Sequence, residues 1–193
     1  GLRKAVALFH AHWQAFAGQG APLVVLLPRR PADVSAHDAL DGEHLGPAAE
    51  SMQILATDIS TRVLATARKG LYRHESFPKP LVPWMGRYLL RGKNHFEGWY
   101  QVKPEVRRMI HFEHINLVKP LEVRQKFAAI FCRNVMIYFD RPTQEQVVNR
   151  LAACLEPGGY FFVGHSESLS GVKHTLQYVR PATYRKDGDG GRA

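Results

Sequence analysis

The chain is poor in cysteine and acidic residues and has no long apolar run. Of its 193 residues only two are cysteine, Cys132 and Cys154, and both stand in apolar stretches. We therefore expect buried free thiols rather than a disulfide framework or a metal site. No window holds the roughly 18 uninterrupted apolar residues of a membrane span, and the N-terminus does not read as a signal peptide. A cytoplasmic protein without membrane insertion is expected.

The scarcity of acidic residues leaves the chain basic. Lys and Arg number 26 against 17 Asp and Glu, which gives a net charge of +9 and favours anionic partners such as an acidic protein substrate. The basic residues are scattered and form no stripe with interleaved aromatics, so nucleic acid is not an expected partner. A hydrophobic content of 45% indicates a packed globular domain, and we expect a monomer.

From Gln53 onward, strand-like and helix-like segments alternate, which is typical of an α/β fold with a mostly parallel sheet. "QILATDIS" is a short apolar run, and "STRVLATARKG" after it has Ser60 as a helix N-cap candidate and Gly70 as a stop. "FAAIFC" and "YFFVGHS" predict two further buried strands. Between them, "RPTQEQVVNRLAACLEPGG" predicts a helix that starts near Pro142 and has an apolar stripe of Val147, Val148, Leu151 and Leu155.

Residues 71–110 differ in character from the segments around them. They are rich in Pro, Gly, Arg and aromatics, and "GWYQVKPEVRRMIHFEHINL" has strand-like pieces without the apolar run of a parallel sheet. We predict an inserted antiparallel subdomain at 71–110, followed by a core strand near His111 to Ile115. The main domain then comprises residues 1–70 and 111–186, with a disordered tail at 187–193.

Polar residues follow the ends of three predicted strands. Asp58 ends the first, and Cys132, Arg133 and Asn134 interrupt the apolar run "IFCRNVMIYFD" at the end of the second. "GHS" ends the third. Each alone is explained by a cap or a surface ion pair, but ligands of open α/β sheets bind outside the carboxyl ends of the strands. Together, the three strand ends favour a binding site.

Five segments, in this order, carry a resemblance to a known family: "ILATDIS", "GWYQVKPEVRRMIHFEHINL", "IFCRNVMIYFDRPTQ", "LEPGGYFFVGHSESL" and "TYRK". They resemble the S-adenosylmethionine-dependent protein-glutamate methyltransferase of bacterial chemotaxis (CheR type) over about residues 52 to 186. "FCRNVMIYFD" and "GHSES" are long and specific elements. The resemblance implies a Rossmann-like sheet with a small antiparallel insertion, S-adenosylmethionine as cofactor and chemoreceptor glutamates as substrate.

Carried over to this chain, the resemblance implies a set of site residues. Asp58 would hold the ribose of the cofactor, and Asn116 and Leu117 would flank the adenine. Arg133 and Asn134 would line the cofactor and substrate pocket, with Arg133 also holding the substrate carboxylate.

Two further residues, Tyr138 and His165, have more than one plausible role. Tyr138 would lie near the transferred methyl, with a core residue as an equal alternative. His165 invites a general-base role, but a glutamate carboxyl with a pKa of about 4.3 is already ionised at neutral pH. Methyl transfer to it needs positioning and desolvation rather than proton removal, so we interpret His165 as structural.

The cytoplasmic domains of chemoreceptors are the expected partners. Besides the methyl-accepting glutamates, a receptor tail peptide is expected to bind at residues 92–110. There we predict an edge strand within "GWYQVKPEV" that accepts an extended peptide by strand addition.

The chain departs from the family after its first predicted strand, "PLVVLL". The family has a glycine-containing loop of the type Ser-Thr-Gly-Glu-Glu-Pro-Tyr-Ser around the methionine part of the cofactor, whereas residues 28–48 begin "PRRPADVSAHDALD". We also expect the family's preceding helical domain to be missing, apart from a remnant helix around Val6 to Phe16. Two explanations stay open. Divergence left a receptor-docking module impaired in catalysis, or residues 28–48 are translated out of frame.

Overall fold

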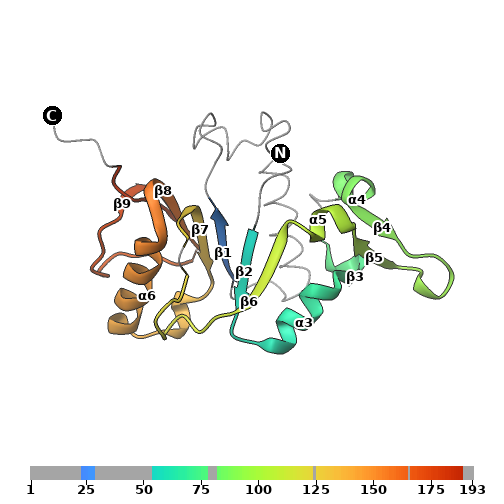
Figure 1. Ribbon diagram of the computed structural model, residues 1–193, viewed down its shortest axis with the longest axis horizontal. Helices are drawn as coiled ribbons and strands as arrows, with labels where there is room; N and C mark the ends of the chain where they lie inside the picture. Colours follow the sequence, from blue (N-terminus) through green and yellow to red (C-terminus); the bar gives the residue numbers. More distant parts are fainter. Residues whose placement is uncertain (1–22, 29–53, 78–81, 124, 165, 189–193) are drawn as a thin grey trace.

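The computed structural model describes residues 23–28, 54–77, 82–123, 125–164 and 166–188. Seven strands form one sheet in the order β6-β2-β1-β7-β8-β10-β9 (Figure 1). They are β1 (Leu23–Pro28), β2 (Ile54–Asp58), β6 (Ile110–His114), β7 (Phe127–Arg133), β8 (Leu155–Val163), β9 (Gln177–Arg180) and β10 (Thr183–Arg185).

Most strands of this sheet point the same way. β2 pairs in parallel with β6, and β7 pairs in parallel with β8. β1 is antiparallel to both β2 and β7, and β10 is antiparallel to β8 and β9. β2, β6, β7, β8 and β9 therefore share one direction, which β1 and β10 oppose. The predicted Rossmann-like α/β fold, a mostly parallel sheet with an antiparallel insertion, is confirmed.

The direction of β1 determines where the chain leaves the sheet. Leu23 pairs with Arg133 and Pro28 with Phe127, so β1 starts at the edge where β2, β6, β7 and β8 end, here called the carboxyl edge. β1 therefore ends at the opposite edge. An apolar run carries no signal for strand direction, since its side chains alternate in the same way when the run is reversed. The predicted remnant helix and residues 29–48 lie outside the described residues.

Helix α3 (Thr61–Lys69) has the ends that the sequence predicts. The Oγ of Ser60 accepts a hydrogen bond from the backbone N–H of Val63 at 3.3 Å, and Gly70 ends the helix with a left-handed φ of 61°. Leu64 and Ala67 are the buried residues of this helix.

Helix α6 (Arg141–Cys154) covers one face of the sheet beside β7 and β8 (Figure 1). It ends one residue earlier than its predicted stripe, because Leu155 is the first residue of β8 and pairs with Phe127. Pro157 disfavours a helical conformation at residue 156, so the helix must stop before it. No helix within the described ranges is long and apolar enough to cross a membrane.

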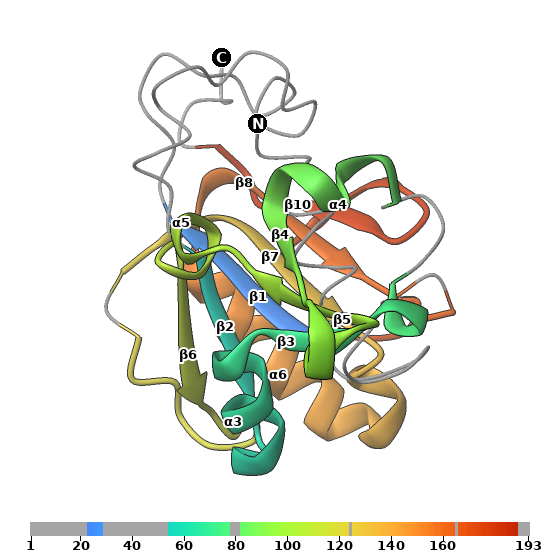
Figure 2. The same ribbon diagram turned by 90° about the vertical axis from the view of Figure 1, so that its right-hand side faces the viewer.

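A second, three-stranded sheet is inserted between β2 and β6. It consists of β3 (Leu71–Arg73), β4 (Leu89–Arg91) and β5 (Trp99–Val102), with β5 antiparallel to both neighbours. This sheet lies at the end of the molecule opposite to β8 and β9 (Figure 1) and faces the viewer in Figure 2. Around it run α4 (Val82–Tyr88), α5 (Pro104–Arg107) and the 3-10 turns η2 (His74–Ser76) and η4 (Asn94–Phe96). Its own buried cluster is Tyr72, Phe77, Met85, Leu89 and Val102.

One prediction about this smaller sheet is wrong. The strand within "GWYQVKPEV" is β5, which pairs with β3 on one side and β4 on the other, so it is the central strand and has no free edge. The outer strands are β3 and β4. Strand-like composition alone does not show which neighbours occupy the two sides of a strand. The domain boundaries stay predictions, and residues 189–193 of the tail lie outside the described residues.

Candidate functional site

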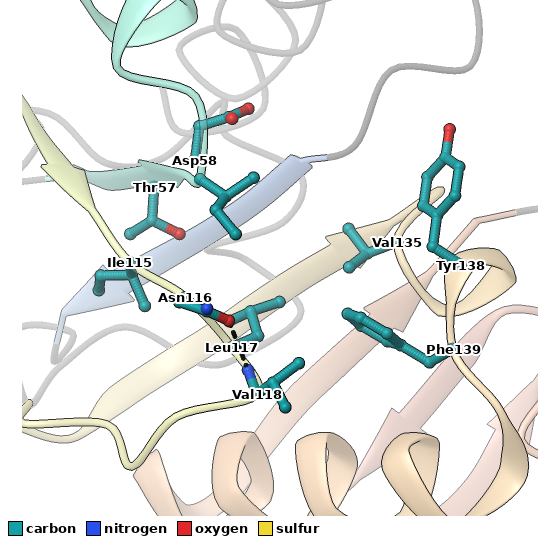
Figure 3. Close-up of a pocket in the computed structure, with 10 residues that line it drawn as sticks. Thr57, Asp58, Ile115, Asn116, Leu117, Val118, Val135, Tyr138 and Phe139 are labelled. Atoms are coloured by element: carbon teal, nitrogen blue, oxygen red, sulfur yellow. Dashed lines mark hydrogen bonds between the residues drawn. The ribbon is translucent and has the colours of Figure 1, made fainter.

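A cavity of about 330 Å³ opens at the carboxyl edge of the large sheet (Figure 3). Three segments line it: residues 57–59 at the end of β2, residues 115–118 after β6, and residues 135, 138 and 139 after β7. Its volume falls at the lower end of the range for small-molecule sites, roughly 300–1,000 Å³. The cavity thus occupies the position where open α/β sheets bind ligands.

Asp58 is the charged residue of the cavity wall. Its Oδ1 accepts a hydrogen bond from the backbone N–H of Ser60 at 2.6 Å. Burial raises the pKa of the Asp58 carboxyl, and this effect outweighs the backbone N–H groups of Ser60 and Ile59 and the charge of His114, which lower it. A half-buried carboxylate at the end of a strand is suited to accept hydrogen bonds from the hydroxyls of a sugar.

The segment after β6 forms a second wall and is fixed by its own polar groups. The Oδ1 of Asn116 accepts from the backbone N–H of Val118 at 3.1 Å, so this asparagine shapes a turn (Figure 3). Arg150 of α6 donates to three successive carbonyls: to those of Leu117 and Lys119 at 3.3 Å each, and to that of Val118 between them. Arg150 was not among the predicted site residues, because nothing in a helical arginine indicates which distant turn it contacts.

Tyr138 belongs to the third wall. It ends the 3-10 turn η5 (Met136–Tyr138) and is 65% exposed, so it is not a core residue. Figure 3 shows Asp58 and Tyr138 on opposite sides of the cavity. The structure therefore brings Asp58, Asn116, Leu117 and Tyr138 together around one space.

Arg133 and Asn134 lie beside the cavity rather than among its lining residues. Arg133 is the last residue of β7, where burial lowers the pKa of its guanidinium and the charge of Glu167 opposes this. Asn134 has a φ of 57°, a left-handed conformation that asparagine tolerates better than most residues. Its identity therefore has a backbone explanation as well as a possible binding one. His165 lies outside the described residues.

Glu167 was missed by sequence reasoning. It is only 7% exposed, and its carboxylate accepts hydrogen bonds from the backbone N–H groups of Asn134, Met136 and Gly164 at 2.8, 2.9 and 2.6 Å. The signal available in the sequence was an acidic residue in "GHSES", directly after an apolar strand. Glu167 thus joins the end of β8 to the segment that follows β7.

Comparison with known proteins agrees with this arrangement. The family "CheR methyltransferase, SAM binding domain", where SAM is S-adenosylmethionine, matches residues 40–185. A chemotaxis protein methyltransferase of Klebsiella aerogenes is 44% identical over 144 residues, which are 74% of this chain and 49% of the relative. Chemotaxis protein methyltransferase 2 of Pseudomonas aeruginosa is 40% identical over 143 residues, 74% of this chain and 51% of the relative.

A chemotaxis protein methyltransferase of Escherichia coli is 42% identical over 127 residues, which are 65% of this chain and 44% of the relative. The chain thus spans about half the length of the relatives that it matches. The family match includes every residue of the cavity wall and begins after β1. By this match and these identities, the chain belongs to the family of CheR methyltransferase SAM-binding domains.

Proposed function

We propose that this chain is the catalytic domain of an S-adenosylmethionine-dependent methyltransferase that esterifies glutamate side chains of chemoreceptors. The observation that carries the proposal is the cavity at the carboxyl edge, with Asp58 and Tyr138 on opposite sides of it, inside the region that matches the family. The names of the relatives support chemotaxis as the setting. A cytoplasmic location follows if the substrates are the cytoplasmic domains of chemoreceptors.

The residues present fit the nucleoside half of the cofactor. Asp58 offers a carboxylate for the ribose hydroxyls, while Leu117 and Val118 offer apolar surface for the adenine beside the turn made by Asn116. For the methionine half, the described residues offer less, since β1 runs opposite to its neighbours and ends at the far edge of the sheet. When bound, S-adenosylmethionine supplies an electrophilic methyl group on a sulfonium.

The chain's own task in this reaction is positioning. A glutamate carboxylate is already ionised at neutral pH, so it needs no base to act as a nucleophile. Arg133 would hold one of its oxygens by a charge-assisted hydrogen bond, leaving the other free to attack, and Asn134 would line the same space. Tyr138 would border the transferred methyl and help to exclude water from it.

We also propose that a receptor peptide docks on the smaller sheet, but at a different strand from the one that the sequence predicts. Because β5 is central, an extended receptor tail would pair with an outer strand, and we favour β4, where Leu90 and Arg91 are exposed. Main-chain hydrogen bonds to β4 would give affinity, and Arg91 would attract an acidic peptide.

The runner-up is a receptor-docking module with the same fold and impaired catalysis. The family match begins at residue 40, which supports the idea that the segment after β1 differs from the family's cofactor loop. Either real divergence or a shift of reading frame over residues 28–48 would produce this difference. Sequencing the coding region from several isolates separates them: an unbroken frame in all isolates excludes the shift.

A methyl-transfer assay tests the proposed function. The purified chain is mixed with S-adenosylmethionine labelled in its methyl group and with a chemoreceptor cytoplasmic domain. We expect a base-labile methyl ester to form on receptor glutamates, and Asp58→Ala to abolish it. Absence of transfer to any receptor domain would favour the docking module, and absence of cofactor binding would also overturn the assignment of this cavity to the cofactor.

A further inference from the structure

The segment that joins β7 to α6 carries Tyr138 and is held by side chains from two directions. We call residues 134–139 the β7–α6 connection. From the end of β8, Glu167 accepts the backbone N–H groups of Asn134 and Met136. From α6, the Nε2 of Gln144 donates to the carbonyls of Met136 and Phe139 at 2.9 and 3.1 Å. Both polar main-chain groups of Met136 are therefore fixed by side chains.

Glu167 makes contacts that no neutral side chain of its size can make. Its Oε2 accepts from the N–H groups of Asn134 and Gly164, and its Oε1 accepts from Met136. A glutamine would point its NH₂ group at one of these donors and lose a partner. Because burying a polar group is unfavourable unless it is hydrogen-bonded, the three N–H groups explain how the side chain of Glu167 is accommodated at 7% exposure.

Gly164 gives the space that this arrangement needs. A Cβ at position 164 would lie 2.6 Å from Oε2 of Glu167 and 2.8 Å from Oδ1 of Asn134. Only glycine lets the end of β8 approach both groups so closely. The carboxylate of Glu167 also interacts electrostatically with the guanidinium of Arg133, at the end of the neighbouring strand.

We propose that Glu167 is a positioning residue: its carboxylate fixes the β7–α6 connection against β8 and thereby sets the places of Arg133 and Tyr138 beside the cavity. The catalytic meaning of this placement rests on the proposed function. The structural part, in which Glu167 binds two backbone N–H groups of the connection and that of Gly164, does not depend on it.

Amide hydrogen exchange of the purified chain measures the attachment directly. In Glu167→Gln we expect the amides of Asn134, Met136 and Gly164 to exchange about tenfold faster or more, because a hydrogen bond to a charged acceptor is lost or weakened. Glu167→Asp should show the same pattern, since the shorter side chain keeps the charge but not the reach. Gly164→Ala should also accelerate exchange at Asn134, because its Cβ would displace the carboxylate of Glu167 without removing it.

Two control variants separate the attachment from general destabilisation. Glu145→Gln alters another carboxylate that accepts a backbone N–H, that of Lys173 at 3.2 Å, away from the connection. Val148→Ala opens space in the buried core under α6 and lowers global stability. Neither should accelerate exchange at Asn134 and Gly164 beyond its effect on the whole sheet. If Glu167→Gln behaves like Val148→Ala, or leaves the three amides unchanged, the proposal is overturned.

Kinetics then test what the attachment does. With a chemoreceptor domain as substrate, Glu167→Gln should lower kcat by about 100-fold, the scale expected for a misplaced reacting group. Cofactor affinity should fall much less, because residues 57–59 and 115–118 of the cavity wall keep their places. Loss of cofactor affinity in proportion to kcat would point to a purely structural role and contradict the positioning role. If the parent chain transfers no methyl at all, the proposed function fails, and hydrogen exchange alone decides whether Glu167 fixes the connection.

Discussion

At the scale of single residues, two carboxylates near the carboxyl edge differ in surroundings and task. Asp58 is half-buried at the cavity, its Oδ1 accepts from the backbone N–H of Ser60, and burial raises the pKa of its carboxyl. Glu167 lies deeper, with three backbone N–H groups around it. A charged side chain whose pKa is perturbed by burial next to a cavity is a candidate for ligand binding. A carboxylate whose oxygens already bind backbone N–H groups instead stabilises the structure around the site.

Asp58→Asn should separate binding from stability. The raised pKa means that the folded state holds the Asp58 proton more tightly than the unfolded chain does. Ionisation of Asp58 therefore lowers stability as the pH rises from the ordinary value of 3.8 through the raised folded value. Asparagine keeps an oxygen for Ser60 and removes this effect, so we expect an equal or higher Tm at pH 7.

Cofactor affinity of the same variant should fall by about tenfold or more, because hydrogen bonds to a charged acceptor contribute about 1.5–3 kcal/mol. Circular dichroism melting and cofactor titration measure both quantities on one sample. Glu113→Gln, at an exposed carboxylate of β6 outside the cavity wall, is the matched control. Undiminished affinity in Asp58→Asn would remove Asp58 from the site.

Arg133→Ala should affect chemistry more than folding. In a chain whose segment after β1 carries the family's glycine-containing loop, we expect methyl transfer to fall about 100-fold while stability stays within about 1 kcal/mol. Arg133→Lys should recover little, since an ammonium lacks the planar fork of a guanidinium. Arg62→Ala, at an exposed arginine of α3, should leave single-turnover methylation unchanged. A large drop in Tm with retained turnover would assign Arg133 to the fold instead.

At the scale of helices and strands, local signals were readable from the sequence and long-range ones were not. Ser60 and Gly70 bound α3 as predicted, because a cap acts within one turn of its own helix. Leu155 was assigned to α6 by periodicity, yet pairing with Phe127 makes it the start of β8. The direction of β1 and the central place of β5 depend on partners far away in the chain.

The same distinction between local and long-range signals explains which site residues could be predicted from the sequence. Asp58, Asn116, Leu117 and Tyr138 were predicted from motifs, and the structure places them around one cavity. Arg150 and Glu167 act on main-chain groups of segments about 30 residues away, with sequence separations of 31 to 33 for the contacts of Glu167 to Met136 and Asn134. No local pattern in the sequence encodes such contacts.

The N-terminus of α6 can be tested through its capping residue, Asp140. Its carboxylate caps α6 by accepting from the backbone N–H of Thr143 at 3.0 Å, and hydrogen bonds from Thr143 lower its pKa. A lowered folded pKa means that the stabilisation is present above the unfolded value of 3.8 and is lost as the pH falls through the folded one.

Asp140→Ala should therefore melt earlier than the parent chain at pH 7, and the difference should shrink at pH values below the folded pKa. Thermal melts across this range check the expectation, with Glu122→Ala, at an exposed loop carboxylate, as the control. If the difference in Tm between Asp140→Ala and the parent chain does not change with pH, the charge of Asp140 does not contribute to capping.

At the scale of the whole molecule, the two sheets are expected to have different functions. The large sheet and α6 bury the main core and form the cavity, whereas the smaller sheet has a separate cluster and lies at the end of the molecule away from β8 and β9 (Figure 1). Binding of the cofactor and docking of a receptor segment are thus expected to be separable by mutation, because residues of one region do not line the other.

Titration of the ¹⁵N-labelled chain with S-adenosylmethionine tests the central claim most directly. We expect saturable amide shifts in three segments, at residues 57–59, at 115–118, and at 135, 138 and 139, because these residues line the cavity. If residues 28–48 lack the family's loop around the methionine half, as the sequence predicts, we also expect this affinity to be orders of magnitude weaker than in a chain that carries the loop. No shift in these three segments at millimolar cofactor, or shifts confined to other segments, would contradict the account.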